Sequence, residues 1–443
     1  MAHAIDLSST CSTLLFTLSG GLPPAIAVHF VSIAWGWLLC LGRPTVTNLL
    51  RAMPEEFERH WTCAHRFFSK YDWSIDALWR ILVCKLIEPL LPSGQPWLVA
   101  VDDTTAHKFG KHVAFAGKFR DAVRSTAAQT VFHWAHNWVV LCLLVPIPAA
   151  RGRFLHLPIS LRLYKKETDC DSRSEFRTRL QLAAEMIQRL REWLPHREIQ
   201  LVADGAYAAK ELTGALPPGI PLISRLRSDA ALYELPPARR KKQRGRPRAK
   251  GARLPSLKSI ARQTQFSRHF IWRYGRKELV LLHSFVCLWY TVAATSPIRV
   301  VIVRDPCGHE HDGYFLSTDP NLSATAIVQA YAARWGIEEL IREAKQSMGF
   351  EQVQSWSPKA VERQAPMALL LQAVTQLAYI QTHQLLSAQP KPTDEPVPIP
   401  SFARMLTALR IAKWQERISS ALRLSADRKK ILRPLQALLA TAG

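Results

Sequence analysis

Three acidic positions in this sequence have the residue type and the placement that phosphoryl transfer needs. Asp102 and Asp103 follow an apolar run in "VAVDDTT", Asp204 follows another in "LVADGAY", and Glu338 lies within "YAARWGIEELIREAK". Carboxylates from separate elements can hold hard divalent cations such as Mg²⁺ or Mn²⁺ through oxygen. Two such ions about 4 Å apart can activate water or a 3′-hydroxyl and stabilise the leaving oxygen of a phosphodiester. Taken singly, each acid is more often a turn or cap residue.

The segment around Glu338 carries a second pattern. Tyr331, Arg334, Glu338 and Lys345 follow one another at steps of three, four and seven residues. In an α-helix, which turns about 100° per residue, all four lie on one narrow face beside an apolar stripe. Such a face is typical of a functional edge, and equally of an ordinary ladder of charges at helical spacing. The helix alone leaves both interpretations open.

The charge balance indicates a polyanionic partner. Lys and Arg number 58 against 35 acids, giving a net charge of +23 and a pI near 10.0. Such an excess most often reflects nucleic acid binding. The densest basic run is broken by Gly and Pro, so we expect an exposed arm that follows DNA and adds salt-dependent affinity, with a solvated loop as the alternative. Its basic residues are Arg239, Arg240, Lys241, Lys242, Arg244, Arg246 and Arg248.

The elements that must position the acids are strands mixed with helices. Apolar runs predict buried strands at 95–103, 137–147 and 197–207, and amphipathic spacing predicts a long helix over 172–195. Two further strand-rich runs cover 278–292 and 298–305, and a short one covers 314–319. The chain before residue 95 has helical spacing throughout. This order predicts an α/β core interrupted by an insertion.

Cysteine usage and hydropathy indicate a cytoplasmic protein. The eight cysteines are scattered without a C-x-x-C pair, which favours a reducing compartment over a disulfide framework or a zinc ribbon. No uninterrupted apolar span of about 20 residues occurs, so we expect no membrane anchor. The start "MAHAIDLSST" lacks the basic region of a signal peptide.

Several segments together resemble one known family. The pattern Y-x2-R-x3-E-x6-K is met at Tyr331, Arg334, Glu338 and Lys345, and "VDDTT" with "HKFGKH", "NWVVLCLL" and "LVADGAY" precede it in order. In these features the sequence resembles the DDE transposases of bacterial insertion sequences. The resemblance spans about residues 95–360.

The resemblance implies an RNase H-like core with a β-rich insertion between the second Asp and the Glu. It implies a catalytic, metal-binding triad of Asp103, Asp204 and Glu338 holding two Mg²⁺ or Mn²⁺ ions. Asp102 remains the alternative first member, because only one of two adjacent residues on an extended chain faces the site. The Asp that directly precedes Thr favours Asp103.

The resemblance also implies partners. Tyr331, Arg334 and Lys345 would contact phosphates of transposon-end inverted repeats, with target DNA as the second substrate and a homodimer formed on paired ends in the bacterial nucleoid. Two alternatives stay open: a catalytically silent DNA-binding protein derived from a transposase, and a nuclease of the same fold that does not integrate.

The domain organisation follows from these features. The expected regions are a helical DNA-end-binding region 1–95, the first part of the core 96–225, the insertion with its basic loop 226–320, the Glu helix and end of the core 321–388, a Pro-rich linker 389–400 and a basic helical tail 401–443.

Overall fold

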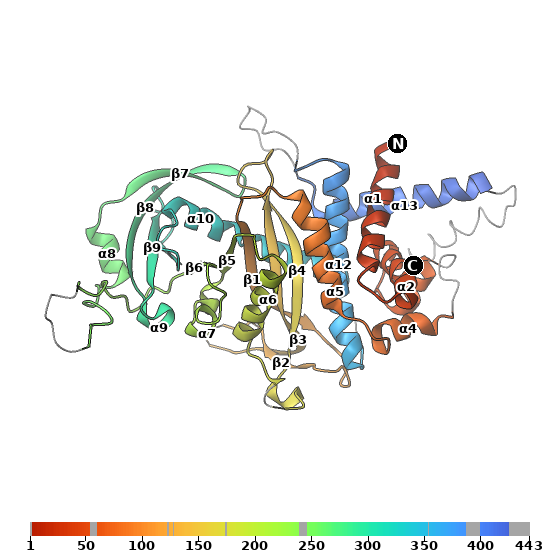
Figure 1. Ribbon diagram of the computed structural model, residues 1–443, viewed down its shortest axis with the longest axis horizontal. Helices are drawn as coiled ribbons and strands as arrows, with labels where there is room; N and C mark the ends of the chain where they lie inside the picture. The colour runs from red at the N-terminus through yellow and green to blue at the C-terminus, as the bar shows by residue number, and fades with distance from the viewer. Residues whose placement is uncertain are drawn as a thin grey trace.

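The computed structural model shows an elongated molecule built around one twisted sheet (Figure 1). Helices gather at one end of the sheet and the strands of the insertion at the other. The structure describes residues 2–53, 60–121, 124–126, 128–172, 175–238, 246–352, 354–386 and 399–424.

Five strands form the centre of the sheet, in an order that differs from their order along the chain. The central strand β1 is antiparallel to β3 and parallel to β5, and β5 is in turn parallel to β6. β4 closes this group by pairing antiparallel with β3. Such a mixed sheet is that of an RNase H-like core. The five strands across the sheet are β4 (Phe154–Tyr164), β3 (Phe132–Pro146), β1 (Trp97–His107), β5 (Ile199–Ala203) and β6 (Leu222–Arg225).

The apolar composition of these strands explains their central position. Residues 135–145 of β3 are buried without the alternation of a half-exposed strand, which is the pattern of a strand covered on both faces. Two helices supply cover, α6 (Arg179–Trp193) and α12 (Pro358–Thr382), and both contact β4. A capping box between Thr178 and Gln181 starts α6.

The β-rich insertion extends the core sheet. Its last strand pairs antiparallel with β6, so the sheet continues outward as β10, β9, β8 and β7. The expected strand-rich runs therefore share one sheet with the acids, although residues 290–292 at the end of the first run are helical. The elements are α8 (Leu257–Gln263), β7 (Ser267–Arg273), β8 (Arg276–Leu288), α9 (Tyr290–Ala293), β9 (Pro297–Arg304) and β10 (Gly313–Ser317), while β2 (Gly117–Arg120) pairs with β3.

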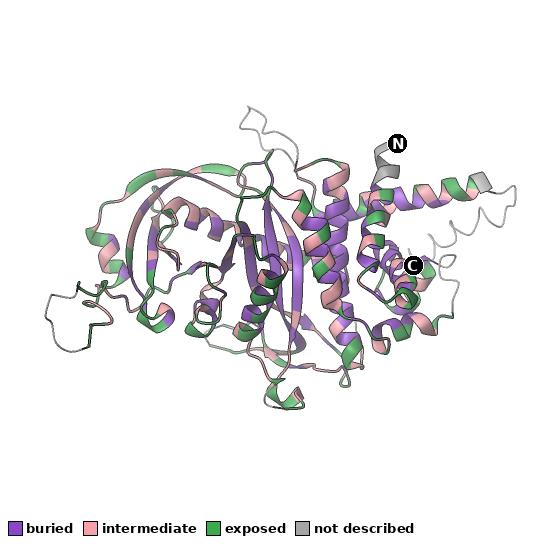
Figure 2. Cartoon of the chain, in the orientation of Figure 1, coloured by how far each residue is buried: buried purple, intermediate pink, exposed green. Residues whose placement is uncertain are grey.

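The helical end is organised around α12. This helix is buried along almost its whole length (Figure 2), and it contacts α1, α4, α5 and α13 as well as β4. Its buried Arg363 donates hydrogen bonds to the backbone oxygens of Phe67, Phe68 and Trp73, which fixes the N-terminal helices to it. The surrounding helices are α1 (Ala2–Ser19), α2 (Pro24–Leu39), α3 (Val46–Ala52), α4 (Thr62–Ser69), α5 (Ile75–Ile81) and α13 (Phe402–Leu424).

The described part of the expected basic tail belongs to this helical layer. Phe402, Met405, Leu406 and Leu409 of α13 are buried, and the helix packs against α1 and α12. The remainder of the tail from residue 425, and residues 387–398 of the linker region, lie outside the described residues. None of the helices in the described ranges is long and apolar enough to span a membrane.

Candidate active site

The register of two parallel strands brings two acids together. β1 and β5 are paired up to Val101 opposite Ala203, so the next position on each chain is Asp102 and Asp204. Neighbours in register on parallel strands point to the same face of the sheet. β5 ends here, and the Asp204 carboxylate accepts a hydrogen bond of 2.5 Å from the backbone N–H of Ala206. The two acids therefore lie at the carboxyl end of β5, where its pairing with β1 stops.

Arg334 joins the third acid to the first. Its Nη1 donates to Asp102 Oδ2 at 2.9 Å, and its Nη2 donates to Glu338 Oε1 at 2.9 Å. The Arg334 side chain is buried, which strengthens both contacts relative to a surface pair. One guanidinium thus spans carboxylates from β1 and from the helix that carries the Y-x2-R-x3-E-x6-K pattern.

The sequence predicts one continuous helix here, but the structure shows two. They are α10 (Ala324–Ala333) and α11 (Gly336–Ser347), joined at Arg334 and Trp335 by tighter turns. There the N–H of Arg334 bonds the oxygen of Tyr331 at 3.2 Å, which is an i to i+3 contact. The prediction of one regular helix is wrong at this point. The Arg334–Glu338 pair is nevertheless formed, because Glu338 lies in the first turn of α11.

Burial makes Asp102 an unusual carboxyl group. Desolvation is the largest influence and raises its pKa to about 6, against the lowering effect of the Arg334 charge. The negative charges of Asp103 and Asp204 raise the pKa further. Asp102 is thus repelled by two neighbouring carboxylates in a partly dry site, and a cation placed among these acids would stabilise their charged forms.

Asp103 has different neighbours. Its Oδ2 accepts hydrogen bonds from Arg179 Nη1 at 3.0 Å and from Asn137 Nδ2 at 3.1 Å, and the Tyr207 hydroxyl lies 3.5 Å from Oδ1. These contacts join it to the start of α6. The structure therefore brings Glu338 to Asp102 and not to Asp103. Arg179 and Tyr207 are absent from the predicted site residues, because no spacing in the sequence relates them to Asp103.

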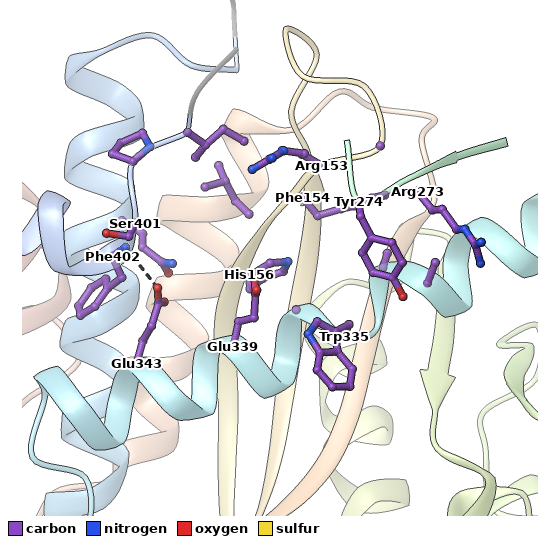
Figure 3. A pocket seen from close by; sticks show the side chains of 18 of the residues that line it. Arg153, Phe154, His156, Arg273, Tyr274, Trp335, Glu339, Glu343, Ser401 and Phe402 are labelled. Atoms are coloured by element: carbon purple, nitrogen blue, oxygen red, sulfur yellow. Dashed lines mark hydrogen bonds between the residues drawn. The ribbon is translucent and has the colours of Figure 1, made fainter. Parts of the chain in front are cut away.

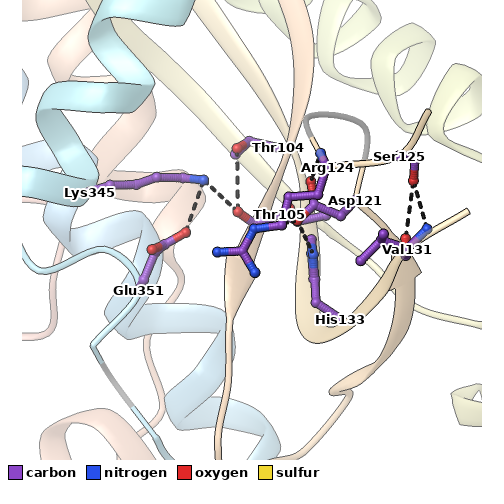
Figure 4. A network of polar contacts seen from close by, with 9 residues as sticks. All are labelled: Thr104, Thr105, Asp121, Arg124, Ser125, Val131, His133, Lys345 and Glu351. Atoms are coloured by element: carbon purple, nitrogen blue, oxygen red, sulfur yellow. Dashed lines mark hydrogen bonds and ion pairs between the residues drawn. The ribbon is translucent and has the colours of Figure 1, made fainter. Parts of the chain in front are cut away.

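Tyr331 precedes Glu338 on α10, and Lys345 follows it on α11. The Tyr331 ring packs on Phe315 with centroids 4.8 Å apart, and the Arg334 guanidinium lies 5.5 Å from its centre. Lys345 is further along α11, where its Nζ donates to the backbone oxygen of Thr105 at 2.7 Å and lies 2.9 Å from Glu351 Oε1 (Figure 4). Lys345 thus fixes the end of α11 to β1.

A basic hollow adjoins Asp204. This cavity, of about 960 Å³, is lined by Tyr331, Arg334 and the exposed cations Arg225, Lys258 and Arg262. Arg225 ends β6, the parallel neighbour of β5, so its nearness to Asp204 could have been expected from the rule that strand ends of a parallel sheet share one edge. Lys258 and Arg262 come from α8 of the insertion, which no local pattern relates to the acids.

The basic arm is described only in part. Arg246 and Arg248 are exposed. Arg239, Arg240, Lys241, Lys242 and Arg244 lie outside the described residues.

A second hollow lies on the other side of α11 (Figure 3). Glu343 there accepts a hydrogen bond from the backbone N–H of Phe402 at 3.3 Å, and burial lowers the pKa of His156 to about 4. Neither Asp102, Asp204 nor Glu338 lines it. This hollow is therefore separate from the acids.

The donor set at the sheet edge fits hard divalent cations. Asp102, Asp204 and Glu338 offer carboxylate oxygens alone, which is the chemistry that Mg²⁺ and Mn²⁺ prefer. The Arg334 guanidinium lies between two of them, where it supplies the positive charge that these carboxylates require.

An RNase H-like sheet with carboxylates where neighbouring strands end is the architecture of a class of nucleases that act through divalent metals. The DDE superfamily endonuclease family matches residues 27–278, which is more than half of the chain, and the protein belongs to this family. Residues 278–383 match the archaeal putative transposase ISC1217. Comparison with curated proteins finds no match. The protein is thus a transposase-like endonuclease of a superfamily that uses divalent metals and acts on DNA.

Proposed function

We propose that the protein is a DNA transposase that cuts at the ends of its own element and transfers the freed strand into target DNA. One observation carries this proposal: Asp102 and Asp204 directly follow the last paired residues of two adjacent parallel strands, and Arg334 bonds both Asp102 and Glu338. Family membership supports the nuclease chemistry, and the net charge of +23 supports a DNA substrate.

Asp102, Asp204 and Glu338 would hold two Mg²⁺ or Mn²⁺ ions. When bound, such ions activate water or a 3′-hydroxyl and stabilise the leaving oxygen. The chain then needs no side-chain nucleophile. Arg334 neutralises Asp102 and Glu338 in the absence of metal, and its planar guanidinium can bind a DNA phosphate once other cations balance these acids.

Asp102 is our choice for the first acid, although the sequence favours Asp103. The register with Asp204 and the bond to Arg334 both support Asp102. Asp103 would instead position Arg179 at the start of α6. The prediction for Asp103 remains the competing assignment, and cleavage by the two Asn variants distinguishes them.

The phosphate contacts would come from three groups of side chains. Tyr331, Arg334 and Lys345 belong to the family pattern, Arg225, Lys258 and Arg262 line the basic hollow, and the arm adds its Arg and Lys residues. We further propose that region 1–95 contributes to recognising transposon ends, and that two copies pair two ends in the cytoplasm at the nucleoid. The excess of basic residues supports contact with DNA over a large surface.

The test is a cleavage assay on duplex DNA that carries the sequences flanking the coding region, with Mg²⁺ and with EDTA. Wild type should cut at both ends only with metal. Asp102→Asn and Glu338→Gln should each lower the rate at least about a hundredfold while leaving DNA binding intact, because a metal ligand contributes several kcal/mol to transition-state stabilisation. Asp103→Asn should stay within about tenfold of wild type.

Other outcomes reassign the site or the function. Loss of cleavage in Asp103→Asn alone would make Asp103 the first acid. Cuts without joining to an added target duplex would identify a nuclease that does not integrate. DNA binding without cutting by the wild type would favour the catalytically silent DNA-binding protein.

A further inference from the structure

Three side chains with metal-ligating atoms lie close together at the C-terminal end of β1. His107 is the last residue of β1, Asp121 directly follows β2, and His133 is the second residue of β3. One ligand atom of each lies within 4.8 Å of the other two. The two imidazole rings have centroids 4.2 Å apart. No sequence pattern predicts this cluster, because its members are joined only by the pairing of three strands.

The cluster is protected from solvent. Asp121 is 7% exposed, and the His133 side chain is 11% exposed. His133 Nδ1 lies 3.2 Å from Asp121 Oδ2 (Figure 4). The other Asp121 oxygen accepts a hydrogen bond from the backbone N–H of Arg124 at 3.0 Å, and Arg124 Nε lies 3.8 Å from Oδ2. Asp121 Oδ2 is thus directed at His133.

The hydrogen-bonding capacity of the His133 ring is not met by the described part of the protein. Both of its ring nitrogens are buried, and neither makes a well-oriented hydrogen bond within the described part of the chain. A buried polar nitrogen left in this state costs about 1–3 kcal/mol. An ion between the two imidazoles and the carboxylate would remove this cost.

We propose that His107, Asp121 and His133 form a binding site for one Zn²⁺ ion, distinct from the site of the three acids. Two imidazoles and one carboxylate suit zinc, which takes nitrogen ligands at about 2.0–2.1 Å in tetrahedral geometry. That geometry separates ligand atoms by about 3.3 Å, which rotation of the His107 and His133 rings can reach. Imidazole favours zinc, whereas the all-carboxylate set favours Mg²⁺, so the two sites differ in metal preference.

The ion would hold together the place where β1 and β2 end and β3 begins. It would link β1, β2 and β3 beside Thr105, whose oxygen receives the Lys345 hydrogen bond. Its role is structural, because the neighbouring charged groups Lys345 and Glu351 are already paired with each other. Bound zinc should therefore stabilise the folded protein by mass action.

The test uses Co²⁺ as a spectroscopic substitute for zinc in the full-length chain. Wild type should bind one Co²⁺ with the intense visible absorption of a tetrahedral ion, without the near-ultraviolet band of thiolate ligation, and Zn²⁺ should displace it. His107→Gln and His133→Gln should each weaken this cobalt binding at least tenfold. His269→Asn is the matched control, since His269 lies on β7 and its ring bonds Ser267 of the same strand.

A second measurement keeps the proposal testable if a variant fails to fold. In the wild type, Zn²⁺ should protect the half-buried His107 from modification by diethylpyrocarbonate, mapped by mass spectrometry, while His269 reacts equally with and without metal. Zn²⁺ should also raise the Tm of wild type and of Glu338→Gln alike. Equal modification of His107 with and without zinc would overturn the site, as would cobalt binding that disappears only when Asp102 or Glu338 is changed.

Discussion

Asp102 allows a test of the site at the level of one residue. Its pKa is raised from 3.8 to about 6, mainly by burial. Because the folded-state pKa exceeds the unfolded value, the protonated carboxyl stabilises the fold below about pH 4, and this contribution is lost as the pH rises through about 6. Relative to Asp102→Asn, the metal-free wild type should thus lose about 2–3 kcal/mol of unfolding free energy between pH 4 and pH 8.

Urea denaturation in EDTA at several pH values measures this difference, and groups common to both proteins cancel. The same comparison for Asp103→Asn serves as the control. A difference between wild type and Asp102→Asn that stays constant from pH 4 to pH 8 would mean that Asp102 is not buried among like charges.

The residue types at the site were readable from the sequence, but their partners were not. The spacing of Arg334 and Glu338 predicts contact at helical separation, and the contact is formed. The choice between Asp102 and Asp103 depends on the register of β1 with β5, which is set by tertiary pairing that no local pattern encodes. Arg225, Lys258 and Arg262 line the hollow beside Asp204 for the same reason, through strand order and the insertion.

Among the elements, the packing of α11 against β4 depends on Gly336, the first residue of the helix. A Cβ at Gly336 would lie 1.9 Å from Nε2 of His156 on β4, closer than any side-chain contact allows. Gly336→Ala should therefore displace α11 from β4 and move Glu338 with it. We expect a loss of about 1–3 kcal/mol of stability and a larger fall in cleavage than this destabilisation alone explains.

Two further variants separate this steric effect from a loss of glycine flexibility. Gly336→Ala combined with His156→Ala should recover much of the stability and cleavage, because the clashing ring is gone. Gly42→Ala should be close to neutral, since its nearest contact would be Asn48 Nδ2 at 4.0 Å. Thermal unfolding and the cleavage assay report both, and an unimproved double variant would show that the contact with His156 does not position α11.

The elements themselves follow the sequence closely where hydrophobic periodicity is strong. The runs at 95–103 and 137–147 lie largely in strands, and the run at 197–207 forms the strand Ile199–Ala203 followed by a short 3₁₀ turn at Gly205–Tyr207. Ser74 and Ser323 each cap a helix by accepting a backbone hydrogen bond. Periodicity could not reveal the tight turn at Arg334 and Trp335, because the helical spacing of the apolar residues continues through it. Nor could it reveal that β10 pairs with β6, because that pairing joins segments far apart in the chain.

For the whole molecule, α12 determines how the terminal regions relate to the core. It contacts β4 on one side and α1, α4, α5 and α13 on others. The expected regions 1–95 and 401–443 therefore share a hydrophobic core in their described parts, rather than lying apart on linkers. A DNA end held by the N-terminal helices would be held rigidly with respect to the acids.

The net charge of +23 predicts how the molecule as a whole binds DNA. Each phosphate contact releases counterions, so the logarithm of the binding constant falls with the logarithm of salt by about 0.9 per contact. Replacing Arg239, Arg240, Lys241, Lys242, Arg246 and Arg248 by Gln should weaken binding to all sequences alike and flatten the slope by about 0.9 for each phosphate that the arm no longer binds. Fluorescence anisotropy from low to high salt measures this slope.

The control variant must lower the net charge without changing any residue of the basic arm. Lys359 on α12 and Arg404 on α13 are exposed and lie at the helical end of the molecule. Changing both to Gln lowers the net charge by two, so a purely global effect would flatten the slope as much as changing Arg246 and Arg248 alone. If the arm follows DNA, only the arm variants should change the slope, because counterions are released where phosphates are bound. An unchanged slope in the arm variants would leave the hollow beside Asp204 as the main phosphate-binding surface.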